Sequence, residues 1–209
     1  MSTQALYWRS WDENQLAGFQ QNQGQTNHCA KYAAAAALNI LFDISIQGED
    51  IVDWLETHFL DGTPRYTILG NTFGSLVVQT AEIVRAAASM YNLSPKVSIS
   101  RGSRDDLLTT LEYDDRVDII SITYLKHNVP RISYGTSLRR IIKKPKVFGG
   151  HMMVLGAYDP THLDEMDQPT PWGFISSWSG AESLYWMPEE DFLRSWGRYS
   201  PFRRVTVRR

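Results

Sequence analysis

The spacing of hydrophobic residues differs between the two halves of the chain. In residues 29–42, a run of strong helix formers carries apolar side chains at i, i+3 and i+4 spacing, which predicts a helix with Thr26 or Asn27 as its N-cap. Further helices are expected over 48–59, 75–91 and 103–113. The first half is therefore predicted to be mainly helical.

The second half carries short runs rich in Val, Ile, Tyr, Phe and Trp, separated by Gly, Pro and Asp, which is typical of an antiparallel sheet. These runs span 95–100, 117–125, 147–158, 172–178, 183–187 and 202–207. Pro188 is expected to open one short helix near the end, because proline is tolerated in a first helical turn. Helices followed by strands predict an α+β fold with a helical layer packed against the sheet.

Composition and charge narrow the class of protein. The 209 residues are 43% hydrophobic and 21% charged, which suits one domain over 1–209. Lys and Arg total 21 against 23 acids, a net charge of −2, so neither nucleic acid nor a lipid surface is expected as a partner. A membrane span and a cleaved leader are not expected either, which predicts a cytoplasmic protein or an effector exported without a cleaved signal.

Basic residues are nevertheless concentrated in one stretch, 126–148, which contains no acid. The basic residues of this stretch are Lys126, Arg131, Arg139, Arg140, Lys143, Lys144 and Lys146. Four more arginines lie at the end, at positions 203, 204, 208 and 209. One interpretation is a solvated loop and a frayed C-terminus, and the other is a docking strip for an acidic partner.

Cys29 is the one cysteine, so no internal disulfide and no zinc-finger cluster is expected. An isolated cysteine is often a small buried hydrophobe. At the predicted start of the 29–42 helix, however, unpaired backbone N–H groups and the helix dipole favour a thiolate with a lowered pKa. Cys29 is therefore a candidate nucleophile. No metal site and no cofactor is predicted, since the chain has neither a phosphate-binding lysine loop nor a metal-ligand spacing.

Three segments of the sequence resemble the papain-like cysteine peptidases. Asn22-Gln23-Gly24, four residues and then Cys29 is similar to the active-site segment of that family, in which the glutamine amide and the cysteine N–H form the oxyanion hole. His151 is similar to the catalytic histidine, because it opens the apolar strand MMVLGAYD after Gly149-Gly150. The two glycines would also let a substrate backbone approach closely.

The third segment, Gly173 to Gly180, is similar to the strand that ends in Asn-Ser-Trp-Gly in the family. Trp178 matches the tryptophan that shields the histidine, but Ser176 stands in place of the asparagine that orients it. Asp159 and Asp167 are alternative orienting groups. The end of the chain, with the acidic short helix that runs to Trp196, resembles the bacterial bacteriocin-processing (C39-like) peptidase domains.

The resemblance implies a papain-like fold, with a helical lobe, an antiparallel sheet lobe and an active-site cleft between them. It covers about residues 20–200, which implies a core over 20–200 and an N-terminal extension over 1–19. It implies a peptidase that hydrolyses peptide or isopeptide bonds of a protein substrate, with Cys29 as nucleophile and His151 as general base and acid. Two alternatives stay open. The same site would serve a transglutaminase, deamidase or acyltransferase, or the chain would be a non-catalytic binding module that has lost the asparagine.

Overall fold

The computed structural model describes residues 4–24, 26–58, 77–125, 128, 130–134, 137–140, 148–178, 183–197 and 202–209. Within them the fold is α+β, with nine strands in one sheet, and every pair of strands is antiparallel. The strand order is β2-β9-β3-β6-β7-β8-β4-β5, with β1 paired to β6. The predicted fold class is confirmed.

The strands of the sheet have the following bounds: β1 Leu6–Tyr7, β2 Lys96–Arg101, β3 Arg116–Leu125, β4 Arg131–Tyr134, β5 Ser137–Arg140, β6 Phe148–Tyr158, β7 Trp172–Ile175, β8 Tyr185–Met187 and β9 Arg203–Arg208. The helices are the short 3-10 turn η1 Trp8–Ser10, then α1 Glu13–Ala17, α2 Cys29–Phe42, α3 Gly48–His58, α5 Val77–Met90, α6 Arg104–Leu111 and α7 Glu189–Gly197. The predicted helices and the six predicted strands are all present. The segments β1, η1, α1, β4 and β5 were not predicted.

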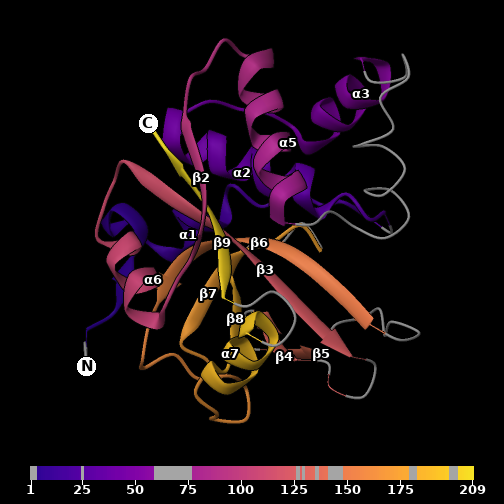
Figure 1. Ribbon diagram of the computed structural model, residues 1–209. Helices are drawn as coiled ribbons and strands as arrows, with labels where there is room; N and C mark the ends of the chain where they lie inside the picture. The colour runs from indigo at the N-terminus through magenta and orange to yellow at the C-terminus, as the bar shows by residue number, and fades with distance from the viewer. Residues whose placement is uncertain are drawn as a thin grey trace.

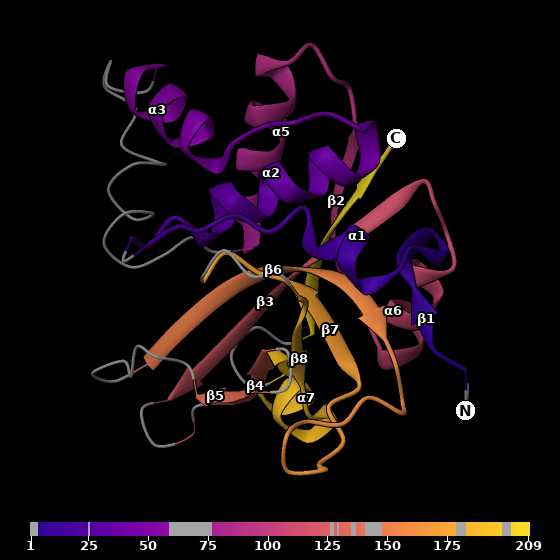
Figure 2. The same ribbon diagram turned by 180° about the vertical axis from the view of Figure 1, so that it is seen from behind.

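Helix α2 lies at the centre of the molecule, above β6, with α3 and α5 on its outer side (Figures 1 and 2). Every residue from Cys29 to Leu41 is buried, including the run of five alanines at 33–37. Small side chains all round this helix let it contact the sheet on one side and two helices on the other. The predicted N-cap is wrong: His28 occupies that position, without a side-chain cap hydrogen bond.

Both ends of the chain join the sheet. Trp8 and Leu16 are buried near the N-terminus, and Val205 and Val207 are buried in β9, between β2 and β3. The interpretation of the C-terminal arginines as a frayed end is therefore wrong, because they flank and belong to an internal strand. The division into an extension and a core of one domain stays a prediction.

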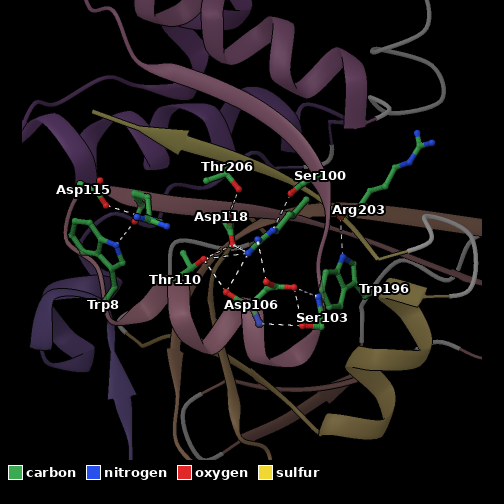
Figure 3. Close-up of polar contacts among 12 residues, drawn as sticks. Trp8, Ser100, Ser103, Asp106, Thr110, Asp115, Asp118, Trp196, Arg203 and Thr206 are labelled. Atoms are coloured by element: carbon green, nitrogen blue, oxygen red, sulfur yellow. Dashed lines mark hydrogen bonds and ion pairs between the residues drawn. The ribbon is translucent and has the colours of Figure 1, made fainter.

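A buried ion pair joins β9 to β3 and α6. The fully buried carboxylate of Asp118 accepts hydrogen bonds from Arg204 (2.7 Å), Thr110 (2.8 Å) and Thr206 (2.5 Å). Figure 3 shows Asp118 between Thr110 and Thr206, under the strand that leads to the C-terminus. This network fixes the position of β9 against β3 and α6.

Candidate active site

His151 lies on β6, and two residues that follow β7 hold its ring. The Nε2 atom of His151 is 2.9 Å from Oγ of Ser176, and the imidazole stacks on the indole of Trp178 with a centroid distance of 3.8 Å and an interplanar angle of 15°. The site is formed here because β7 ends at Ile175, three residues before the predicted end of that strand, so that 176–178 turn toward β6. The structure thus brings His151, Ser176 and Trp178 together.

The stacking and the position on an internal strand leave His151 only 2% exposed. Burial lowers the pKa of His151 to about 3, because the charged imidazolium loses its hydration. In the folded protein the resting imidazole is therefore neutral at physiological pH, as a general base has to be.

The lowered pKa predicts a loss of stability in acid. The unfolded chain binds a proton at His151 below about pH 6.5, whereas the folded chain resists protonation down to about pH 3. The contribution of the neutral His151 to the free energy of unfolding is complete above about pH 6.5 and declines as the pH falls toward 3. At pH 5 the free energy of unfolding should be lower by about 2 kcal/mol. Urea unfolding at pH 7 and pH 5 should show this loss in the wild type but not in His151→Gln. Equal losses in the two proteins would contradict the assignment.

Gln23 contacts the same loop through Ser177. Its backbone N–H donates to the carbonyl of Ser177 (2.9 Å), and its side-chain Oε1 accepts from the Ser177 hydroxyl (2.6 Å). Its Nε2 donates one of two N–H groups to the carbonyl of Thr26 (2.9 Å). These contacts fix which end of the amide is oxygen and which is nitrogen. The part played by Ser177 was not predicted, although Ser177 belongs to the segment that resembles the family.

Cys29 is the first residue of α2 and is 6% exposed. The backbone N–H of Met152, the residue after His151 on β6, interacts with its thiol, as do N–H groups of the first turn of α2. The thiol therefore faces the strand that carries His151.

The expected lowering of the Cys29 pKa is wrong. Burial raises the pKa of the thiol above its ordinary value, and this effect outweighs the opposite effects of the Met152 N–H and of the Lys31 charge. The helix start does favour the thiolate, but the site excludes the water that would solvate it. The resting state is a neutral thiol, and a base is needed to form the nucleophile.

Tyr124 is a site residue that the sequence did not reveal. It pairs with Gly149 across β3 and β6, and a Cβ atom at Gly149 would lie 2.8 Å from its ring. Burial and the neighbouring Cys29 raise the pKa of the Tyr124 hydroxyl. Gly149 therefore has a structural reason to be glycine, since a side chain there would displace the tyrosine. Gly150 is exposed beside it, and its part in substrate binding stays a prediction.

The alternative orienting acids lie elsewhere. Asp159 follows β6, accepts a hydrogen bond from Tyr7 (3.3 Å) and holds the turn at Thr161, and Asp167 belongs to the turn that Asp164 closes. In the part of the chain that the structure describes, the hydroxyl of Ser176 is the hydrogen-bond partner of His151.

Most of the basic stretch 126–148 lies outside the described residues or has no described side chain. Arg131 is described, and its backbone N–H and Nε donate to the buried carboxylate of Asp191 (2.8 and 2.9 Å). This arginine therefore attaches β4 to α7.

No group of three His, Cys, Asp or Glu side chains capable of holding a metal ion occurs among the described residues. None of the helices in the described ranges is long and apolar enough to cross a bilayer.

Comparison with known proteins gives matches at the level of structure. No family model and no curated protein sequence matches the chain. A crystal structure described as a C39-like peptidase from Bacillus anthracis superposes with a TM-score of 0.58 at 12% identity, over 99% of this chain and 98% of that chain. Xylellain, a cysteine protease from Xylella fastidiosa, superposes with a TM-score of 0.54 at 15% identity, over 98% of this chain and 85% of that chain. The protein therefore has the fold of the papain-like cysteine peptidases, including the C39-like branch.

Proposed function

We propose that this protein is a cysteine peptidase that cleaves peptide or isopeptide bonds through a thioester on Cys29. The observation that carries the proposal is the arrangement of His151: its Nε2 is bonded to Ser176, its ring is held by Trp178, and its strand faces the Cys29 thiol through the neighbouring Met152 N–H. The papain-like fold of the solved neighbours supports it.

In the first half of the reaction, Nδ1 of His151 accepts the thiol proton as Sγ of Cys29 attacks the carbonyl carbon of the substrate. Burial disfavours each charge alone, but the imidazolium and the developing anion form together and stabilise each other. The oxyanion accepts hydrogen bonds from the second N–H of Gln23 Nε2 and from the backbone N–H of Cys29. The C–N bond then breaks, and the imidazolium gives its proton to the leaving amine.

In the second half, His151 accepts a proton from water as the water oxygen attacks the thioester carbonyl. The carbon–sulfur bond breaks, the acid is released, and the sulfur recovers its proton from the imidazolium. The hydroxyl oxygen of Ser176 accepts the Nε2–H throughout. The nitrogen that takes up and gives back the proton is therefore Nδ1, on the other side of the ring.

Alkylation of Cys29 by iodoacetamide tests the pair directly, since the chain has one cysteine. At pH 6 we expect His151→Gln to be alkylated about tenfold more slowly than the wild type, because general-base assistance is lost. His162→Gln is the matched control: His162 also bonds a hydroxyl (Thr170, 2.7 Å) and stacks on a tryptophan (Trp186, 3.9 Å). Equal rates in His151→Gln and the wild type would refute the proposal.

The acceptor of the acyl group is identified by a second measurement. A mixture of peptides incubated with the protein in ¹⁸O-water should yield new carboxyl termini that contain ¹⁸O, detected by mass spectrometry, and Cys29→Ser should yield none. Products joined by new amide bonds, without ¹⁸O, would instead identify a transferase.

A further inference from the structure

The side chain of Gln20 contacts two places that follow β7. One is Ser176, in the segment 176–178 that contacts His151, and the other is Ser183, shortly before β8. The Oε1 of Gln20 accepts a long hydrogen bond from the backbone N–H of Ser176 (3.4 Å), and its Nε2 donates to the carbonyl of Ser183 (2.5 Å). A single amide group therefore fastens Ser176, two residues before Trp178, and Ser183, two residues before β8.

Residues near Gln20 extend this attachment. Gln23 binds the backbone and the hydroxyl of Ser177. At the other end, the carboxylate of Glu13 accepts hydrogen bonds from the backbone N–H of Leu184 (3.1 Å) and from Nε1 of Trp186 (3.0 Å). Residues 13, 20 and 23, which precede α2, thus hold five residues that follow β7: Ser176, Ser177, Ser183, Leu184 and Trp186.

The position of the segment 176–178 decides the orientation of the His151 imidazole. Ser176 hydrogen-bonds to the His151 ring and Trp178 stacks on it, and both belong to the segment 176–178 that Gln20 and Gln23 hold. Cys29 begins α2 only nine residues after Gln20, so the attachment ties the loop of the base to the segment of the nucleophile. A displacement of a catalytic group by about 1 Å can cost 10²-fold in rate.

We propose that Gln20 is a positioning residue for catalysis, which orients His151 through Ser176 and Trp178. The proposal rests on the proposed function, since it requires His151 to act on Cys29. Gln20 does not touch the reacting atoms. Its effect passes through the loop and therefore depends on the presence of His151.

The chain supplies a matched control in the next residue. Gln21 also uses both ends of its amide, donating to the carbonyl of Ile46 (2.7 Å) and accepting from the N–H of Gly48 (2.6 Å). These contacts attach the α2–α3 connection rather than the loop. Gln20→Ala and Gln21→Ala thus remove the same types of hydrogen bond, and urea unfolding measures whether their losses of stability are comparable.

The experiment is a double-mutant cycle read by alkylation of Cys29 at pH 6. We expect Gln20→Ala to lower the rate about fivefold, and Gln20→Ala/His151→Gln to be no slower than His151→Gln alone, because both changes remove the same assistance. In the Gln21→Ala background, His151→Gln should retain its full effect on the rate of alkylation.

If Gln20→Ala does not fold, Gln20→Glu replaces it in the experiment, because Gln20→Glu keeps the acceptor for Ser176 but removes the donor to Ser183. We then expect the alkylation rate to fall about threefold, since one of the two contacts remains.

The outcomes separate the two proposals. Equal rates for the Gln20 variant and Gln21→Ala, or effects of Gln20 and His151 that multiply, would overturn the positioning role and leave the proposed function intact. An absence of any effect of His151→Gln in the wild-type background would overturn the proposed function itself.

Discussion

Asp118→Ala is expected to lower the free energy of unfolding by about 3–5 kcal/mol, because it leaves a buried guanidinium without its counter-charge. The Asp118 carboxylate is fully buried, and the side chain of Arg204 is 14% exposed. Arg204 would keep neutral hydrogen-bond partners, the Ser100 hydroxyl (3.2 Å) among them, and one long ion pair with the half-exposed carboxylate of Asp106 (4.0 Å). The guanidinium can neither lose its proton nor regain its hydration without moving β9.

Urea unfolding at pH 7 measures this loss, and Asp115→Ala is the control. Asp115 pairs with Arg116 at the start of the same strand, at 3.0 Å, but its side chain is 51% exposed. Such a surface pair contributes only about 0–1 kcal/mol. A loss below 1 kcal/mol for Asp118→Ala would show that Arg204 reaches solvent, and that the network does not hold β9.

Ser176→Ala is expected to lower kcat/KM for peptide hydrolysis about 10- to 100-fold, because the imidazole loses the hydrogen bond that holds its ring in the orientation for catalysis. With the hydroxyl present, Nε2 lies 2.9 Å from Oγ, and in the proposed mechanism its N–H donates there and leaves the lone pair on Nδ1. Without the hydroxyl, this hydrogen bond is lost and only the stacking on Trp178 still orients the ring. Hydrolysis of a fluorogenic peptide library by the two proteins gives the ratio.

Two further substitutions make this result specific. Ser195→Ala removes another buried serine hydroxyl, which has no hydrogen-bond partner among the described residues, so hydrolysis should keep its wild-type rate. Ser176→Asn restores an amide oxygen with a longer reach, and we expect it to raise the rate. An unchanged rate for Ser176→Ala would mean that Ser176 does not orient His151.

The helices of the first half were predictable because their signals are local. Helix α2 has the predicted bounds, and α6 begins at the residue after Ser103, which caps it by accepting from the Asp106 N–H. Local spacing and capping act within one or two turns, so the sequence contains the whole cause. The strands β3 and β9 were predictable for a similar reason, since runs of β-branched residues favour extended, buried backbone.

The unpredicted elements depend on distant partners. The two-residue strand β1 exists because Leu6 and Tyr7 pair with Tyr158 and Ala157 on β6. Strand β5 pairs with β4, and β4 pairs with β8, about 50 residues later in the chain. Such short segments carry too few residues for a periodic signal, so only their pairing defines them.

In the candidate site, the sequence by itself determined the chemical groups: the lone thiol at a helix start, the histidine behind two glycines, and a serine and a tryptophan at the end of a strand. Only the tertiary structure decided their states. It buries His151 and Cys29, so that burial lowers the pKa of the one and raises the pKa of the other. It also places Tyr124 beneath Gly149 and directs Gln20 to the loop of Ser176. Desolvation and cross-strand contact arise between segments far apart in the chain, and no local pattern encodes them.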